Sequence, residues 1–187
     1  GSDKRAKYGV VGSAVNLASR LESYTIGGQI LLSADTLQVL GPLVNVTEPI
    51  EIEAKGIEQP LTVYDVQGIG APYNLFLPVR DVALVPLQEA LPLQYTIVEG
   101  KRLAGTVCSG RLVKLSSRGG ALYSEQPVAP WSDIKIQLLG PHGETQPGEL
   151  YAKILLPLPE NPQGFTVHFT SVSPEVAALF QHLLTQQ

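Results

Sequence analysis

The sequence contains little cysteine, little charge and no long apolar run. Its one cysteine, Cys108, cannot form an internal disulfide, which suits a reducing compartment and predicts a cytoplasmic protein. The three histidines, His142, His168 and His182, are far apart in the chain, so no structural zinc site is expected. No apolar run approaches the roughly 20 residues of a membrane-spanning helix, and the polar first residues predict no signal peptide.

Charged residues are scarce as well. Only 16% of the 187 residues are charged and the net charge is −4, which excludes a general basic surface for nucleic acid. The apolar share of 44% is sufficient for a hydrophobic core and argues against global disorder. The length allows one large domain or two small ones, and the 15 prolines and 18 glycines predict many turns between short elements.

The first 69 residues predict strands that alternate with helices. Short apolar, β-branched segments indicate the strands, and apolar residues at helical spacing indicate the helices. Ser13 and Ser33 each precede a helical pattern and are predicted to cap it. The expected elements, in the order β-α-β-α-β-β, are a strand at 8–11, a helix at 14–24, a strand at 29–33, a helix at 34–40, a strand at 44–54 and its hairpin partner at 61–66.

The first predicted helix carries two polar side chains of chemical interest. Asn16 and Arg20 are four residues apart, so they lie on the same face of the helix. The apolar residues that recur at helical spacing and are expected to face the core are Ala14, Leu17, Ala18 and Leu21. An isolated pair such as Asn16 and Arg20 is typical of an ordinary helix surface, so its meaning depends on the sequence around it.

The chain changes character after a turn-rich break at 68–74. A linker is predicted at 70–79, followed by a domain at 80–187 in which short apolar segments recur at the spacing of all-β proteins. The candidate strands lie at 91–98, 103–108, 111–115, 120–123, 133–139, 150–155 and 165–169. Pro174 opens a helix at 175–184 with an apolar stripe of Val176, Leu179, Phe180, Leu183 and Leu184. The predicted fold class is α+β: a partial α/β sandwich, then a small β-barrel or sandwich with a C-terminal helix.

Several segments of the first part resemble class III adenylate and guanylate cyclases. They are Asn16-Leu-Ala-Ser-Arg20, the preceding Tyr8-Gly-Val-Val-Gly-Ser-Ala-Val15 and the following Gly27-Gly-Gln-Ile-Leu-Leu-Ser33, in the order that the family shows. Lys55-Gly56 and Val63-Tyr64 also fit the closing hairpin of that family. The resemblance covers residues 1–69 and corresponds to the C-terminal portion of the cyclase catalytic domain.

The resemblance implies a role for both polar side chains of the helix. Cyclases of this family attack the α-phosphate of a nucleotide with the ribose 3′-hydroxyl and expel pyrophosphate. Arg20 would stabilise the negative charge that develops on the phosphate oxygens, and Asn16 would orient the ribose. Gly9 stands at a position that contacts the purine base in the family, and its lack of a side chain leaves the choice between ATP and GTP open.

The resemblance also implies metal ions and a partner. Family members hold two ions, Mg²⁺ or Mn²⁺, with two aspartates of the N-terminal half. The only acid before the predicted helix at 14–24 is Asp3, so no metal ligand is assigned. We therefore expect this chain to be inactive as a cyclase by itself. Because family active sites form between two subunits, the expected partner is a second copy in a homodimer or a complementary cyclase half.

The segment Leu112-Val-Lys-Leu-Ser-Ser-Arg-Gly-Gly-Ala-Leu122 is similar to the core of PilZ domains, which bind cyclic di-GMP in bacteria. Ser116 and Gly119 match the family signature, whereas Lys114 replaces its acidic or amide residue. The upstream arginine pair is reduced to Arg80, because a leucine stands at the second position. The resemblance covers about 75–187 and implies a ligand site whose motifs are altered.

Residues 80–118 contain the one concentration of basic side chains in this acidic chain. These basic side chains suit a site for cyclic di-GMP or another anion, and they equally suit a docking surface for an acidic protein partner. The residues of that possible site are Arg80, Lys114, Ser116, Arg118 and Gly119. The structural alternative is that Ser116 and Gly119 form a tight turn and that the basic side chains are only solvated.

Three functions remain open from the sequence. The first is the C-terminal part of a bacterial nucleotide cyclase with a PilZ-like regulatory domain, acting in intracellular signalling. The second is a non-catalytic interaction module in which the cyclase segment is only a folded support. The third is a cyclic di-GMP receptor without cyclase function.

Overall fold

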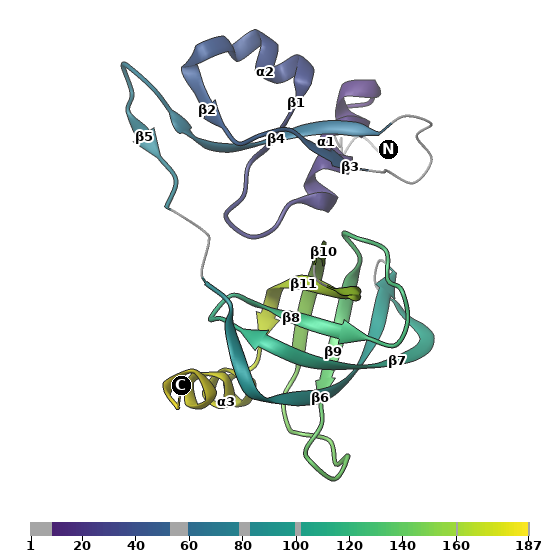
Figure 1. The fold of residues 1–187 in the computed structure, drawn as a ribbon. Coiled ribbons are helices and arrows are strands. Elements are labelled where there is room, and N and C mark those ends of the chain that lie inside the picture. Colours follow the sequence, from purple (N-terminus) through teal and green to yellow (C-terminus); the bar gives the residue numbers. More distant parts are fainter. Residues whose placement is uncertain (1–8, 53–59, 79–82, 100–101, 160, 187) are drawn as a thin grey trace, which may run out of the picture. The chain divides into compact units, whose positions relative to one another are not determined.

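The computed structural model describes residues 9–52, 60–78, 83–99, 102–159 and 161–186. The chain divides into two compact units, Gly1–Val79 and Arg80–Gln187. Figure 1 shows the helices and strands of each unit. Within the described residues, no helix is long and apolar enough to cross a membrane.

The first unit is built around a central strand, β4 (Leu61–Ile69). Its antiparallel partners in the described residues are β1 (Leu31–Ser33), β2 (Val44–Val46), β3 (Ile50–Ile52) and β5 (Leu75–Phe76). The helical elements are α1 (Ser13–Tyr24), α2 (Ala34–Leu40) and a 3₁₀ turn (Gly41–Leu43). The described residues of this unit form a small apolar interior, and its buried members are Ile52, Val63 and Val66.

Both predicted helices of this unit are present. Ser33 caps α2 as predicted, because its hydroxyl accepts a hydrogen bond from the Thr36 N–H at 3.3 Å. The prediction of Ser13 as a cap is wrong, since α1 already begins at Ser13 and Gly12 precedes it with a φ of 140°. Glycine adopts this φ at little cost, so Gly12 favours a helix start at the next residue.

The strand predicted at 8–11 is wrong for residues 9–11, which form no strand; Tyr8 lies outside the described residues. Val10 and Val11 are 78% and 95% exposed. A strand needs a neighbouring strand to satisfy its backbone hydrogen bonds, and no described strand pairs with these residues. A short β-branched segment is therefore not sufficient by itself to predict a strand.

The long strand predicted at 44–54 is divided into β2 and β3. Between them, the Thr47 N–H donates to the Asp65 carbonyl of β4 at 2.9 Å. Pro49 has no backbone N–H and so cannot donate a hydrogen bond to a neighbouring strand. The predicted hairpin partner is confirmed, since β3 pairs with β4 and Ile50 lies opposite Val63. The end of the predicted strand and its turn, residues 53–59, lie outside the described residues.

Part of the predicted linker at 70–79 contributes to the first unit. Leu75 and Phe76 form β5, which pairs with Ile69 and Gly68 at the end of β4. A Cβ at Gly68 would lie 2.5 Å from the Phe76 ring, so a glycine is needed for this close approach.

Within the described part of the second unit, six strands close into a barrel (Figure 1). The order around the barrel is β10-β11-β8-β7-β6-β9, and all neighbours are antiparallel. The strands are β6 (Val85–Glu99), β7 (Arg102–Leu115), β8 (Gly119–Ser124), β9 (Asp133–Leu138), β10 (Leu150–Leu158) and β11 (Asn161–Val172). The predicted α+β class with a small barrel is confirmed. The strands predicted at 103–108 and 111–115 are two parts of β7.

The barrel interior is filled by apolar side chains that alternate along the strands. Fully buried examples are Leu93, Leu112, Leu122, Ile134, Ile136, Leu150 and Ile154. The C-terminal helix α3 (Pro174–Thr185) packs against this core with Val176 and Phe180 buried. The Phe180 ring stacks on the Phe169 ring at a centroid distance of 5.2 Å. The predicted stripe on this helix is confirmed, because its three leucines also pack against the core.

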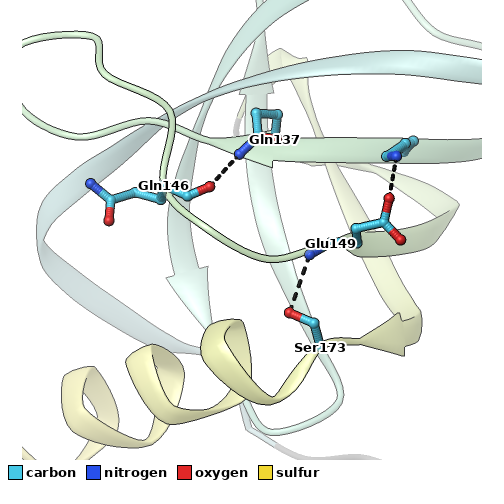
Figure 2. Close-up of polar contacts among 5 residues, drawn as sticks. Gln137, Gln146, Glu149 and Ser173 are labelled. Atoms are coloured by element: carbon cyan, nitrogen blue, oxygen red, sulfur yellow. Dashed lines mark hydrogen bonds and ion pairs between the residues drawn. The ribbon is translucent and has the colours of Figure 1, made fainter.

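Polar contacts hold the start of α3 against the loop between β9 and β10 (Figure 2). The Glu149 N–H donates to the Ser173 hydroxyl at 3.1 Å, and the Ser173 N–H donates to the Glu149 carbonyl at 2.9 Å. The Gln137 side-chain amide donates to the Gln146 carbonyl at 2.6 Å across the same loop. Lys135 forms an ion pair with the Glu149 carboxylate. These contacts fix where α3 meets the barrel.

Tyr95 places a phenol inside the barrel. The residue is 1% exposed, and its hydroxyl lies 2.6 Å from the Ser124 hydroxyl. Burial raises the pKa of Tyr95 to about 12, because the ionised phenol would lose its solvation. In the unfolded chain the same group ionises near its ordinary value of 10.0.

We expect the free energy of unfolding to decrease as the pH rises from about 10 towards about 12, because the unfolded chain loses the Tyr95 proton first. This contribution is fully present below the unfolded pKa and is lost as the pH passes through the folded pKa. Urea unfolding at about pH 8 and about pH 11 measures it. The Tyr95→Phe variant should lose less stability over this interval than the wild type, and an equal loss would contradict the assignment.

Candidate functional sites

Helix α1 presents Asn16 and Arg20 on its surface. Both residues are exposed and lie one turn apart, as the sequence predicts. The backbone around them is regular: the Asn16 N–H donates to the Gly12 carbonyl at 3.0 Å, and the Arg20 carbonyl accepts from the Ser23 hydroxyl at 2.7 Å. An amide and a guanidinium are therefore held in fixed register and are accessible to a bound molecule.

The apolar face of α1 is not buried. Leu17 and Leu21 are half-buried, Ala14 and Ala18 are exposed, and the helix contains no buried residue. The prediction that these four residues face a core is wrong for the exposed Ala14 and Ala18, and Leu17 and Leu21 are covered only in part. Instead they border a groove of about 400 Å³. Its lining residues are Ser13, Ala14, Leu17, Ala18, Leu21, Ser33, Asp35 and Thr36.

Gly9 lies in the segment before α1 and is exposed. A Cβ at this position would meet no atom within 4 Å. The fold of the described residues therefore does not require a glycine here, and a base-reading side chain would have space.

The described residues do not fit the metal ions that the cyclase resemblance implies. Among them, no group of three or more His, Cys, Asp and Glu side chains is arranged to hold a metal ion. The described residues closest in sequence to Asn16 and Arg20 offer only one carboxylate on α1, that of Glu22. No catalytic step is therefore assigned to a metal on this chain.

In the barrel, Ser116 closes the turn between β7 and β8. Its hydroxyl donates to the Gly119 carbonyl at 3.2 Å and accepts from the N–H groups of Arg118 and Gly119 at 3.3 and 3.1 Å. A serine hydroxyl offers one donor and two acceptor positions, so the turn engages its full capacity. Because Ser116 is also only 4% exposed, it has no donor left for a ligand.

Gly119 and Gly120 are required by close packing at the same turn. A Cβ at Gly119 would lie 2.2 Å from the Val167 carbonyl oxygen of β11. A Cβ at Gly120 would lie 2.5 Å from the Leu112 side chain and 2.9 Å from the Lys114 carbonyl oxygen. The structure therefore supports the structural reading of Ser116 and Gly119.

The remaining residues of the predicted anion site surround this turn only in part. Arg118 is exposed and Lys114 is half-buried. Val85 pairs with Leu115, so the first residues of β6 lie beside the end of β7, and Leu84 immediately precedes them. Arg80 lies outside the described residues.

The structure also shows a charged pair that sequence spacing does not reveal. The Lys153 ammonium lies 2.9 Å from an Asp133 carboxylate oxygen, and the Lys153 side chain is 7% exposed. The two residues meet because β9 and β10 are antiparallel with Lys153 opposite Asp133. This pair joins neighbouring barrel strands and gives the buried Lys153 ammonium a partner of opposite charge.

Residues 1–68 match the family model described as the Adenylate and Guanylate cyclase catalytic domain. Among solved structures, the chain is similar to the guanylyl cyclase Cya2, with 51% sequence identity, a TM-score of 0.39, and coverage of 42% of this chain and 40% of that chain. The N-terminal segment is thus similar to part of a cyclase catalytic domain, as the sequence motifs predict.

Two further solved structures are similar at low identity. One is the inhibitor of motility MotI/DgrA of Bacillus subtilis, with 12% identity, a TM-score of 0.41, and coverage of 77% of this chain and 65% of that chain. The other is MrkH of K. pneumonia, with 13% identity, a TM-score of 0.35, and coverage of 76% and 64%. The chain spans less than two thirds of the length of each of these three structures. Among curated proteins, none matches the chain significantly.

Proposed function

We propose that this chain supplies one half of a class III nucleotide cyclase site and joins it to a regulatory barrel of the PilZ type, in intracellular signalling in a bacterial cytoplasm. The single observation that carries the proposal is α1. It holds Asn16 and Arg20 exposed and one turn apart, inside the segment that matches the cyclase catalytic domain.

The geometry of α1 suits the charge changes of nucleotide cyclisation. The ribose 3′-hydroxyl loses its proton to water, and its oxygen forms a bond to the α-phosphorus. The bond from that phosphorus to the oxygen that bridges to the β-phosphate breaks, and pyrophosphate leaves with the electron pair. Negative charge grows on the phosphate oxygens, and a positioned guanidinium such as that of Arg20 stabilises it. The amide of Asn16 offers both a donor and an acceptor for a ribose oxygen.

The chain by itself is proposed to be inactive, since the described residues do not fit the metal ions of the family. A partner that carries the aspartate pair, with Mg²⁺ or Mn²⁺, would complete the site. The metal ions would supply charge neutralisation at the triphosphate, and this chain would supply Asn16 and Arg20. The product would be cyclic AMP from ATP or cyclic GMP from GTP. Gly9 offers no side chain that would select one of the two bases.

A reconstitution experiment tests the proposed function. The purified chain is mixed with the N-terminal half of a class III cyclase catalytic domain that carries the aspartate pair, and cyclic AMP and cyclic GMP are measured with ATP or GTP. We expect no product from either protein alone and product from the mixture. Product from this chain alone, or none from a mixture in which the two proteins associate, would overturn the proposal.

The barrel is proposed to regulate the pairing of the cyclase halves, either through its own position or through a molecule that binds to it. If a bound molecule favours one arrangement of the barrel, it shifts the pairing of the cyclase halves by the difference in its affinity for the two states. The exposed Arg118 in the turn between β7 and β8 is the feature that favours an acidic partner or an anion at this place.

Cyclic di-GMP is the anion that the PilZ resemblance suggests, and calorimetry tests it. We expect no saturable binding in the micromolar range, because Ser116 is fully engaged in the turn and leucine replaces one arginine of the family pair. Loss of one charged hydrogen-bonding partner weakens binding about tenfold to a hundredfold. Saturable heat at micromolar ligand, abolished by Arg118→Ala, would instead make the barrel a receptor.

A further inference from the structure

The end of α3 meets the first part of β6 at a pocket of about 250 Å³ in the second unit (Figure 1). We call it the α3 pocket, and its lining residues are Leu87, Gln88, Glu89, Leu91, Leu183 and Gln186. None of them belongs to the candidate cyclase site or to the candidate anion site at the turn between β7 and β8. The pocket is therefore a separate feature of the barrel.

An irregularity in β6 forms one wall of the α3 pocket. The pairing of β6 with β7 shifts register between Pro86 and Leu91, where β6 holds more residues than β7. A bulge of this kind turns side chains out of the regular alternation of a strand. Here Leu87 and Leu91 are half-buried against the barrel core, whereas Glu89 is exposed at the same pocket.

The C-terminal end of α3 forms the other wall, and this end is electrically negative. The last carbonyl groups of a helix lack partners within the helix, and the helix dipole places about half a negative charge there. The Gln186 amide nitrogen lies 2.7 Å from the His182 Nε2, which leaves the amide oxygen of Gln186 as a further acceptor. Leu183 is half-buried and supplies the apolar part of this wall.

Glu89 adds a full negative charge to the α3 pocket. Among the described residues, its carboxylate forms no ion pair. The other lining residues are leucines and glutamines, so no positive charge in the lining compensates it. An anionic ligand would be repelled both by Glu89 and by the end of α3. The pocket thus combines apolar side chains with an uncompensated negative charge.

A long cationic side chain suits both properties. Lysine and arginine carry their charge at the end of an apolar stem, which can pack on apolar surface while the charge meets acceptors. The volume is sufficient, because an engineered apolar cavity of about 150 Å³ holds benzene, which has about as many heavy atoms as a lysine side chain. A free polyamine suits the pocket less well, since the lining has no second carboxylate for its further charges.

We propose that the α3 pocket is the docking site for a lysine or arginine side chain on the surface of a partner protein. The stem of that side chain contacts Leu87, Leu91 and Leu183, and its charge lies near the Glu89 carboxylate and the C-terminal end of α3. This partner has the opposite charge to the one that Arg118 favours, so the barrel carries two docking sites of different chemistry. The inference does not depend on cyclase activity.

Methyl NMR of the full chain tests the α3 pocket with two matched peptides. One is a blocked pentapeptide with a single lysine between alanines, and the other carries norleucine, which keeps the apolar stem but lacks the charge. The lysine peptide should shift the methyl signals of Leu87, Leu91 and Leu183 in a saturable manner. It should bind about two- to fivefold more tightly than the norleucine peptide.

Two variants separate the charge of the pocket from the general charge of the barrel. Glu89→Gln should weaken binding of the lysine peptide about two- to fivefold and leave binding of the norleucine peptide unchanged. Glu125→Gln is the matched control, since Glu125 is also an exposed carboxylate of the second unit and does not line the pocket. The control should bind both peptides like the wild type.

Several results would overturn the docking site. These are equal binding of the two peptides, an affinity for the lysine peptide that Glu89→Gln leaves unaltered, and the absence of saturable shifts at the three leucines. Pentylammonium copies the lysine stem without a peptide backbone. If this amine binds and neither peptide does, the pocket takes a free amine and the protein partner is wrong.

Discussion

Replacing Arg20 with alanine is expected to reduce cyclic nucleotide formation by the reconstituted pair about 100- to 1,000-fold. Arg20 is exposed on α1, one turn from Asn16, and is proposed to contact the phosphate oxygens where charge develops. Removing one such donor takes away stabilisation that exists mainly in the transition state. The loss should therefore appear in kcat more than in KM.

The measurement is the initial rate of cyclic AMP or cyclic GMP formation at saturating partner half, with Arg111→Ala as the matched control. Arg111 is also exposed, but it lies on β7 of the second unit and is not one of the candidate anion-site residues, so its loss should leave the rate unchanged. Arg20→Lys should recover part of the activity, since lysine keeps the charge but lacks the planar pair of donors. Activity that is insensitive to Arg20→Ala would favour a cyclase segment that serves only as a folded support.

Replacing Gly119 with alanine is expected to destabilise the barrel by about 1–3 kcal/mol or more. The added Cβ would lie 2.2 Å from the Val167 carbonyl oxygen. Backbone of a neighbouring barrel strand cannot move away as a flexible side chain would, because Val167 is paired with both β8 and β10. The turn and β11 would have to separate, and the hydrogen bond from the Phe169 N–H to the Arg118 carbonyl at 2.8 Å would weaken.

Urea unfolding of the full chain, followed at Trp131 in the second unit, measures this loss. Gly105→Ala is the matched control, because Gly105 also lies in the barrel, in β7, and a Cβ there would meet no atom within 4 Å. The control should change stability little. Equal stability of Gly119→Ala and the wild type would contradict the structural role of this turn.

Features set by neighbouring residues could be predicted from the sequence. The hydroxyl of Ser33 accepts a hydrogen bond from the N–H of Thr36, three residues later, so the cap of α2 depends only on neighbouring residues. The period of the apolar residues in α3 likewise indicates which side is buried, and Val176 and Phe180 are buried as expected. Ser116 and Gly119 are recognisable as a turn because their hydrogen bonds also close over three residues.

Features set by distant residues could not be predicted. The pattern at 44–54 reads as one strand, but its pairing with β4 shifts register between Asn45 and Val46, and β2 ends at Val46 before β3 begins at Ile50. Val10 and Val11 have strand-forming side chains and form no strand, because strand formation needs a partner that the pattern does not name. The approach of Asp133 to Lys153 follows only from the register of β9 and β10.

The candidate site shows the same division. The spacing of Asn16 and Arg20 placed them on one helical face without any tertiary information, because 3.6 residues per turn is a property of the helix itself. The sequence also marked the apolar face of α1, but only the tertiary structure shows that this face is at most half-buried and borders a groove. Periodicity states which side chains a helix would bury, whereas burial depends on which other segments pack against them.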